Sequence, residues 1–402
     1  MTQIKPKLWT KDFIVASTIN FFLVLIFYLL AVTIAVYAVE EYGASTSEAG
    51  LVTGIFIIGA LVGRLFIGRI IDSIGRKKTI VIGLILFTLT TLLYFLSLGL
   101  SFLLLTRFLH GMTLGMASTG AGTIAAQIIP MARKGEGIGY FSMSATMGTA
   151  LGPFIGLYMS QRASFEMIFG VCLLLGVISL IISLFIYVPP VESPSEKGMP
   201  KGFQLSNYIE PKALPIAVIT LVSGLCYSGV LSFINFYAIE VDLVETASFF
   251  FVVYAIAVLL SRPFTGRLMD RKGANFIMYP AFLSLGAGLV LLSTANTSAM
   301  LLLAGVLIGL GFGNIQSTTQ AVAVKLTPPH RMGLATSTFF IFMDAGLGFG
   351  PYVLGFLIAM TGYSTLYVIL GGVALATSFL YYLLHGKKER ASKAENPAFD
   401  TV

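Results

Sequence analysis

The sequence predicts an all-α integral membrane protein with twelve transmembrane helices in two six-helix pseudo-symmetric bundles. Three observations lead to this fold class. The 402 residues are 56% hydrophobic and 11% charged, with a mean hydropathy of +0.91, which lies outside soluble globular usage. Long apolar stretches recur along the whole chain. The segment Gly63–Lys78 returns in similar form at Ser261–Asn275, so the chain is a duplication.

The two copies are related by a constant offset of 198 residues, as from Asp72 to Asp270. Two separate landmarks in each half share this offset. The first is the loop, whose Gly68, Asp72 and Gly75 return as Gly266, Asp270 and Gly273, and the second is Gly152-Pro153, which returns as Gly350-Pro351. We therefore expect both halves to have the same architecture.

Each half contains apolar stretches that reach the ~20 residues needed to span a bilayer as a helix. In the first half they lie at roughly 13–39, 46–71, 79–98, 101–128, 137–160 and 166–188. In the second half they lie at roughly 213–238, 246–268, 275–295, 299–325, 333–360 and 364–385. The first stretch lacks a signal-peptide cleavage pattern, so we expect it to be retained. Residues 1–188 and 212–386 are predicted to form the two bundles.

The segment Pro189–Pro211 is rich in proline, serine and charge, which predicts a cytoplasmic linker at 189–211. Residues 387–402 are predicted to form a disordered cytoplasmic tail. All but four of the 25 lysines and arginines lie in the N-terminus, in the tail, or in the connections that follow the second, fourth, sixth, eighth and tenth apolar stretches. The four exceptions are Arg64, Arg107, Arg162 and Arg262. The positive-inside rule then places both termini in the cytoplasm.

This topology also accounts for the net charge of +7, because the basic residues would face the anionic inner leaflet. We therefore expect the lipid bilayer, and no nucleic acid, as the partner of these charges. The predicted location is the plasma membrane, of the bacterial inner or cell membrane type, with a multi-pass topology.

The sequence GRIIDSIGRKK at Gly68–Lys78 resembles the loop motif between the second and third helices of the major facilitator superfamily. The resemblance covers nearly the whole chain. In that family the carboxylate that corresponds to Asp72 interacts with the N-terminus of the eleventh helix, here near Arg331 to Thr336, and latches one conformation. The resemblance thus implies a conformational latch formed by Gly68, Asp72, Gly75 and Arg76, with Gly266, Asp270 and Gly273 in the second copy.

By repeat symmetry, Asp270 is expected to face the start of the stretch near Gly135 to Ile138. The second copy has Ala274 and Asn275 where the first has Arg76 and Lys77. This difference predicts a second latch that is weaker or purely geometric.

The sequence GTALGPFIG at Gly148–Gly156 resembles the fifth-helix motif that is associated with exporting antiporters in the family. Gly148, Gly152 and Gly156 would form a ridge of small residues, and Pro153 would bend the helix. Close helix packing alone would also produce this pattern.

The sequence around Arg107 and His110 resembles the family's fourth-helix motif. Arg107 either extends to the outer interface or lines a cavity, because intramembrane arginines commonly mark a pathway. His110 lies one turn further on the same face and is of a residue type that titrates near neutral pH. It is either part of the proton-coupling machinery or a neutral, hydrogen-bonded core histidine.

Asp344 is the one carboxylate deep within a predicted span, ~16 Å along the helix from Gly333 at ~1.5 Å per residue. We predict that it couples transport to protons, with Arg107 and His110 as further candidates. The structural alternative is a fixed hydrogen bond or ion pair, for example with Arg64. The predicted substrate cavity is largely apolar, with polar and aromatic residues at Asn20, Tyr227, Asn235, Phe236, Asn314, Gln316 and Gln320.

The chain carries no Walker loop, metal-ligand cluster or nucleophile elbow, so we expect no enzyme activity, no cofactor and no metal. The prediction is a monomeric secondary transporter for small molecules and protons, most similar to twelve-helix drug:proton antiporters, which exports amphiphilic compounds by alternating access. One alternative is an exporter or importer of a specific metabolite on the same fold. A non-transporting membrane receptor or scaffold is the other.

Overall fold

The computed structural model describes residues 6–190 and 204–390, and all regular secondary structure in these ranges is helical. The helices of the first half are α1 (Lys11–Tyr42), α2 (Thr46–Ile74), α3 (Arg76–Leu92), η1 (Leu93–Phe95), α4 (Leu100–Ile128), η2 (Met131–Arg133), α5 (Lys134–Ser160) and α6 (Phe165–Leu184). After η3 (Leu205–Asn207), the second half has α7 (Leu214–Glu240), α8 (Val244–Lys272), α9 (Asn275–Ser293), α10 (Ser298–Ile308), η4 (Gly309–Gly313), α11 (Asn314–Lys325), η5 (Pro329–Arg331), α12 (Met332–Tyr381) and η6 (Tyr382–Gly386).

Hydroxyl side chains start several of these helices. Thr10, Ser45, Ser164 and Thr297 have extended backbones and accept a hydrogen bond from the N–H three residues later. The backbone N–H of Ser45 in turn donates to the side chain of Glu48, which completes a capping box. These caps satisfy N–H groups that a helix cannot pair internally.

Ten helical stretches in the described part of the chain are long and apolar enough to cross a membrane, which makes this a multi-pass membrane protein. The ten do not include α5, whose apolar residues are interrupted by glycine, serine and threonine. One of the ten stretches contains the whole of α12, although the backbone of Gly362, with φ 76° and ψ 171°, divides α12 into two helical parts. The twelve-helix, two-bundle arrangement therefore remains a prediction.

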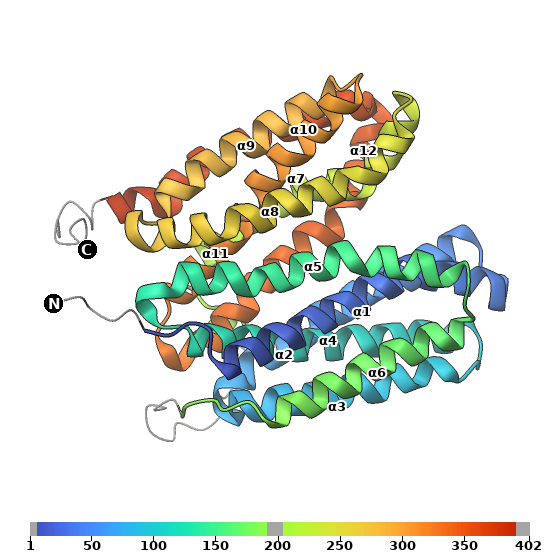
Figure 1. The fold of residues 1–402 in the computed structure, drawn as a ribbon, viewed down its shortest axis with the longest axis horizontal. Helices are drawn as coiled ribbons and strands as arrows, with labels where there is room; N and C mark the ends of the chain where they lie inside the picture. Colours follow the sequence, from blue (N-terminus) through green and yellow to red (C-terminus); the bar gives the residue numbers. More distant parts are fainter. Residues whose placement is uncertain (1–5, 191–203, 391–402) are drawn as a thin grey trace. The chain divides into compact units, whose positions relative to one another are not determined.

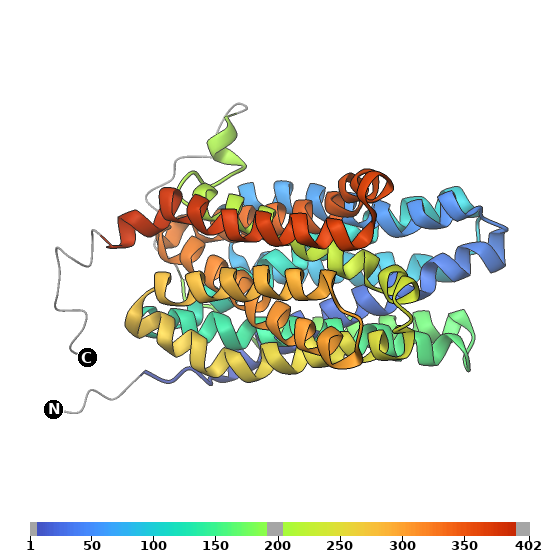
Figure 2. The same ribbon diagram turned by 90° about the horizontal axis from the view of Figure 1, so that it is seen from above.

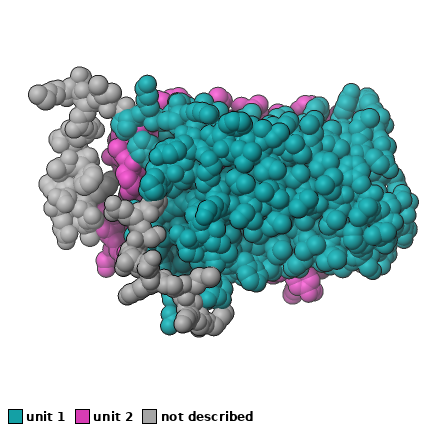
Figure 3. Space-filling model, turned by 90° about the horizontal axis from the view of Figure 1, so that it is seen from below, with its two compact units in different colours: residues 1–130, 144–210, 327–341 teal, residues 131–143, 211–326, 342–402 magenta. Residues whose placement is uncertain are grey.

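The chain divides into two compact units, coloured separately in Figure 3. Unit 1 comprises Met1–Pro130, Ser144–Glu210 and Thr327–Ile341, and unit 2 comprises Met131–Met143, Pro211–Leu326 and Phe342–Val402. Each unit thus contains most of one sequence half and a short segment of the other. The predicted domain boundaries at 188, 211 and 386 remain a prediction.

Within unit 1, α2 and α4 pack with their backbones in close approach. A Cβ atom at Gly63 would lie 2.0 Å from the carbonyl oxygen of Met112, and one at Gly111 would lie 2.0 Å from that of Phe56. Only glycine permits such an approach, as is usual for helix pairs in lipid. Figures 1 and 2 show α2 and α4 running side by side.

Unit 2 repeats this contact at the offset of 198 residues, in which Gly111 corresponds to Gly309 and Phe56 to Tyr254. A Cβ atom at Gly309 would lie 2.8 Å from the carbonyl oxygen of Tyr254. Here, however, the helix is interrupted by the π-helical segment Gly309–Gly313, which has no equivalent in α4. Such segments commonly mark functional sites in helices.

The glycine ridge of α5 packs against α1. Cβ atoms at Gly148, Gly152 and Gly156 would lie 2.9, 2.7 and 2.8 Å from atoms of Val24, Tyr28 and Leu29. Pro153 lies inside the helix. The motif therefore has a packing role in unit 1, as expected if close helix packing produced the pattern. Its role in antiport remains a prediction.

The start of the predicted tail is ordered as a helix, which corrects the expectation of disorder from residue 387 onward. Residues 387–390 are helical, and the carboxylate of Glu389 accepts hydrogen bonds from the N–H groups of Ala274 and Asn275 at 2.7 and 2.9 Å. A carboxylate at the N-terminus of α9 compensates the free N–H groups there. The remainder of the tail, 391–402, and linker residues 191–203 lie outside the described residues.

Candidate functional site

The first of two similar carboxylate sites lies in unit 1, at the end of α2. The backbone N–H of Gly333, at the start of α12, donates to both carboxylate oxygens of Asp72 at 3.1 and 3.3 Å. Arg76 pairs with the same carboxylate, with 2.9 Å between Nη2 and Oδ1. We call Asp72, Arg76 and Gly333 the first carboxylate site.

Local geometry explains why Arg76 reaches Asp72. Gly75 has φ +98°, in the region that favours glycine, so α2 stops and α3 begins within one residue. The guanidinium of Arg76, only 5% exposed, also donates to Gln127 Oε1 at 2.7 Å and to the carbonyl oxygen of Pro329. Arg76, the first residue of α3, thus connects α3 with α2, α4 and η5 in unit 1.

Glu210, near the end of the predicted linker, adds polar contacts to the start of α12 in unit 1. The carboxylate of Glu210, which is buried, pairs with Arg331 at 2.5 Å, and its backbone N–H donates to Thr338 Oγ1 at 2.9 Å. Sequence analysis did not single out Glu210 or Arg331 as a pair, because no local pattern relates residues 121 positions apart.

The second carboxylate site lies in unit 2 and has the same arrangement. The N–H groups of Gly135 and Glu136, at the start of α5, donate to Oδ1 and Oδ2 of Asp270 at 2.7 and 2.8 Å. Gly273, with φ +80°, ends α8 as Gly75 ends α2. Asp270, Gly135, Glu136 and Lys325 form the second carboxylate site.

Of the two expectations for the second site, a weaker or a purely geometric latch, the purely geometric one is wrong because a cation is present, and the weaker one stays a prediction. Lys325, the last residue of α11, lies 2.8 Å from Oδ1 of Asp270. The sequence comparison considered only the position of Arg76, which is Ala274 in the second copy. The cation comes instead from a different helix, at the position that corresponds to Gln127.

Glu136 extends the second site through two arginines. Its carboxylate oxygens accept from Arg267 Nε at 2.8 Å and from Arg133 Nε at 2.7 Å. Burial opposes the charged form, but the hydrogen bonds and charges of Arg133 and Arg267 outweigh burial and hold the pKa of Glu136 below its ordinary value of 4.5. Glu136 precedes the stretch expected to lie in the membrane.

The motif glycines allow the close approach of the segments at both sites. A Cβ atom at Gly68 would lie 2.4 Å from Ser337 Oγ, and one at Gly266 would lie 2.7 Å from the Cα of Glu136. Larger residues at these two positions would move the carboxylates away from the N–H groups that donate hydrogen bonds to them. The predicted latch residues thus lie together within each unit.

The Arg107 and His110 cluster is fully buried in unit 1. Arg107 donates from Nε to the carbonyl oxygen of Val52 at 3.1 Å and from Nη1 to the hydroxyl of Tyr94 at 3.2 Å. His110 lies between Tyr94, at 3.0 Å from Nδ1, and Thr91, at 3.1 Å from Nε2. Arg107 therefore does not extend to the interface, and His110 matches the alternative of a hydrogen-bonded core histidine.

Tyr227, on α7, is the one predicted cavity residue that belongs to an aromatic stack. Its ring lies 4.2 Å from that of Phe312 at an interplanar angle of 11°, and 5.2 Å from that of Tyr254. Phe312 lies in the π-helical segment η4. Sequence analysis missed Phe312 and Tyr254, although Tyr254 occupies the offset position of Phe56, which stacks with Phe27 in unit 1.

Several of the other predicted cavity residues have structural contacts. In unit 1, Asn20 donates to Ser144 Oγ at 2.9 Å. In unit 2, Asn314 ties α11 to α8, because its amide oxygen accepts from Thr265 at 2.8 Å and its Nδ2 donates to Ser261 at 3.3 Å.

The remaining predicted cavity residues lie in unit 2. Gln316 donates to the sulfur of Met343 at 3.2 Å. Gln320 is buried, while Asn235 and Phe236 are exposed. Phe236 follows Tyr227 by nine residues, which places the two on opposite faces of α7, so the structure does not bring Phe236 to the stack.

Asp344 lies on α12 in unit 2, directly after Met343, and is half-buried. Gly333 and Asp344 lie in the same helix, and the distance of ~16 Å between them stays an expectation. Gln316 donates to Met343, the residue that precedes Asp344 in the sequence. None of the described residues forms a group of three or more histidines, cysteines or acids that could hold a metal ion.

The chain is similar in sequence to known membrane transporters. The model of the Major Facilitator Superfamily matches residues 16–293 and 243–401. The uncharacterized MFS-type transporter MJ1560 of Methanocaldococcus jannaschii is 28% identical over 362 residues, which cover 88% of this chain and 93% of that protein. The quinolone resistance protein NorA of Staphylococcus aureus is 30% identical over 195 residues, which cover 48% of each protein.

Among solved structures, the human organic anion transporter MFSD10 (TETRAN) has a similar fold. The match has a TM-score of 0.75 at 16% sequence identity, and it covers 94% of this chain and 100% of that chain.

Proposed function

Because the chain belongs to the Major Facilitator Superfamily, a family of membrane transporters, we propose that it is a proton-coupled exporter of amphiphilic small molecules. The proposal includes twelve transmembrane helices in two six-helix halves, a monomeric state, and both termini in the cytoplasm of a bacterial or archaeal cell. The observation that carries it is the duplicated carboxylate site, at Asp72 and again at Asp270.

The two sites support a carrier that alternates between states. In each, a carboxylate accepts from backbone N–H groups at the start of a helix, an interaction worth up to ~2 kcal/mol in partly buried geometry. In each, the carboxylate and the N–H groups come from opposite halves of the sequence. A contact of this size can hold one conformation and still break during a transport cycle, so we propose that both sites act as latches.

Proton coupling is assigned to Asp344. A charged carboxylate near the middle of a membrane helix costs about 2.5 kcal/mol or more on insertion scales, a cost that function or a partner must compensate. Reversible protonation at this position would allow proton and substrate occupancy to exchange. Arg107 and His110 are secondary candidates, because their buried hydrogen-bond network serves packing in unit 1.

The aromatic stack favours an amphiphilic substrate. Tyr227, Phe312 and Tyr254 form a buried stack of apolar rings, and the two tyrosines carry hydroxyl groups, the combination that binds planar, partly polar compounds. The name of NorA connects that relative with resistance to quinolones, which are planar amphiphiles. The glycine ridge of α5 is consistent with the antiporter motif of exporters.

The experiment is transport by the purified chain in proteoliposomes under an imposed pH gradient. We expect accumulation of a fluorescent amphiphile such as ethidium that collapses when the gradient is removed by an ionophore. Protein-free liposomes measure the leak. Gradient-independent equilibration would favour a facilitator, flux of one metabolite but no amphiphile would favour the specific-metabolite alternative, and the absence of any flux would favour a receptor or scaffold.

A further inference from the structure

Residues 204–210, at the end of the predicted linker, form a segment of unit 1 that we call the linker clasp. Arg331, the last residue of η5, donates from Nε to the buried carboxylate of Glu210 at 2.5 Å and from Nη2 to the carbonyl oxygen of Ser206 at 2.7 Å. The backbone N–H of Glu210 donates to Thr338 Oγ1 at 2.9 Å. The linker clasp thus makes three polar contacts with η5 and the first turns of α12.

The linker clasp also contacts α2. Arg69 donates from Nη1 to the hydroxyl of Tyr208, and its Cζ lies 5.0 Å from the centre of the Tyr208 ring. Arg69 precedes Asp72 by three residues, and Arg331 precedes Gly333 by two. Asp72 and Gly333 are the acceptor and the donor of the first carboxylate site. The linker clasp therefore binds one arginine beside each partner of that site.

The second carboxylate site has arginines at the same two positions. At the offset of 198 residues, Arg267 corresponds to Arg69 and Arg133 corresponds to Arg331. One carboxylate holds both: Glu136 accepts from Arg267 Nε at 2.8 Å and from Arg133 Nε at 2.7 Å. Glu136 belongs to α5 itself, and its backbone N–H is one of the two donors of the second site. The second site thus contains the acid that holds its arginines.

The first half has a leucine in the place of this acid. Glu136 corresponds to Leu334, and the two residues are similarly buried, at 5% and 6% exposed. A leucine side chain offers no acceptor, whereas a guanidinium that leaves water needs one. In unit 1 the acceptors come from Glu210 and Tyr208 instead. The contact that α5 makes by itself in the second half is therefore made by the linker clasp in the first.

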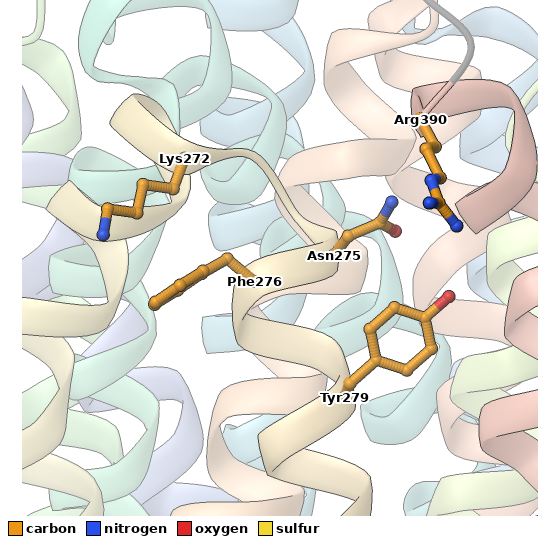
Figure 4. Close-up of a pocket in the computed structure, with 5 residues that line it drawn as sticks. All are labelled: Lys272, Asn275, Phe276, Tyr279 and Arg390. Atoms are coloured by element: carbon orange, nitrogen blue, oxygen red, sulfur yellow. The ribbon is translucent and has the colours of Figure 1, made fainter. Parts of the chain in front are cut away.

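The C-terminal segment of unit 2 shows how an acid outside a helix can hold the start of that helix. The carboxylate of Glu389 accepts from the N–H groups of Ala274 and Asn275 at the start of α9. Figure 4 shows this junction, with the amide of Asn275 directed toward the segment that carries Arg390. Such an acid compensates the free N–H groups and the partial positive charge of the helix start.

We propose that Glu210 is a positioning residue of the first carboxylate site, through which the linker sets the strength of that site. By holding Arg331, Glu210 keeps the start of α12 where its N–H groups reach Asp72. The second site carries its own acid, Glu136, and does not depend on the linker. The inference rests on the proposed latch function, to which it adds control of one latch by the linker.

The test is hydrogen–deuterium exchange of the purified full-length protein, followed in peptides from the start of α12 and from the start of α5. Glu210→Ala should speed exchange at the start of α12 about tenfold, because it removes a hydrogen bond to a charged group. Exchange at the start of α5 should stay unchanged. Arg331→Ala, at the other end of the same contact, should have the same effect. The control Glu240→Ala removes an exposed acid at the end of α7 and should leave both peptides as in wild type.

A rescue variant separates positioning by the acid from general packing. Glu210→Ala/Leu334→Glu places an acid at the position of Glu136, and it should restore at least half of the lost protection at the start of α12. This variant restores the charge without restoring the contact of the linker clasp.

Three results would overturn the proposal. They are wild-type exchange at the start of α12 in both Glu210→Ala and Arg331→Ala, an equal increase at the start of α5, and no recovery in Glu210→Ala/Leu334→Glu. Transport tests the proposed latch separately. Faster exchange with wild-type transport in Glu210→Ala would support the positioning role and would remove the first site from the proposed function.

Discussion

The ammonium of Lys325 lies 2.8 Å from Oδ1 of Asp270, in the place that the guanidinium of Arg76 takes beside Asp72. At the repeat offset, Lys325 corresponds to Gln127 and Arg76 corresponds to Ala274. The first half therefore has a cation at Arg76 and none at Gln127, whereas the second half has none at Ala274 and one at Lys325. The carboxylate environment is retained in both halves, although the cation has exchanged positions.

This exchange predicts that a lysine at position 127 can take over the role of Arg76 beside Asp72. Arg76→Ala should reduce transport about tenfold, because a hydrogen bond to a charged group contributes about 1.5–3 kcal/mol. Adding Gln127→Lys should restore at least half of the lost activity, since alanine and lysine occupy these positions in the second half. Initial transport rates in proteoliposomes check this. A double variant no better than Arg76→Ala would show that the two positions are not interchangeable.

The close approach at Gly266 predicts a strong effect of a single methyl group. Gly266→Ala should destabilise the protein by about 1–3 kcal/mol, because its Cβ would meet the backbone of Glu136, which cannot rotate away. Gly170→Ala on α6 is the matched control, since no atom lies within 4 Å of its Cβ and alanine favours a helix. Thermal unfolding in detergent measures both. Equal melting temperatures for the two variants would contradict the packing at Gly266.

The environment of Glu136 predicts a pH dependence of stability. Its pKa in the folded protein lies below the ordinary value of 4.5, so its contribution to stability is present above pH 4.5 and is lost as the pH falls through the folded pKa. The melting temperature of wild-type protein should therefore fall more between pH 5 and pH 3 than that of Glu136→Gln. Parallel curves for the two proteins would exclude this carboxylate as a source of acid sensitivity.

The aromatic stack predicts how the protein binds amphiphiles. Tyr227→Ala should weaken binding of ethidium about three- to tenfold, because aromatic pairs contribute about 0.5–1.5 kcal/mol beyond buried area. Phe236→Ala, on the opposite face of the same helix, should bind as wild type. Fluorescence titration of the purified variants measures both affinities. A larger loss for Phe236→Ala than for Tyr227→Ala would move the substrate site away from the stack.

Sequence reasoning located the motif residues because they repeat as a local pattern. Asp72, Gly75, Asp270 and Gly273 follow from one duplicated loop. The contact of Asp72 with the start of α12 follows from the family resemblance, and that of Asp270 with the start of α5 follows from the repeat symmetry. Lys325 did not follow, because it lies 55 residues from Asp270 and no local spacing relates them.

The aromatic partners of Tyr227 were missed for a similar reason. Phe312 lies in a π-helical segment, and a reading at 3.6 residues per turn does not place it correctly. Phe236 lies on the opposite face of α7 from Tyr227 and is exposed, and hydrophobicity alone does not tell which of these two faces packs inward. The tail was predicted as disordered from its charge, but Glu389 compensates N–H groups that only the fold brings near it.

The most direct test of proton-coupled export compares Asp344→Asn with wild type in proteoliposomes, with Asp242→Asn as the matched control. Asp242 is exposed and has φ +57°, a conformation that asparagine tolerates, so its change should be neutral. Asp344→Asn keeps the side-chain shape but cannot release a proton. It should abolish uphill ethidium transport driven by a pH gradient, while ethidium binding persists and loses its pH dependence. Uphill transport at the wild-type rate in Asp344→Asn would contradict the account and remove Asp344 from the coupling mechanism.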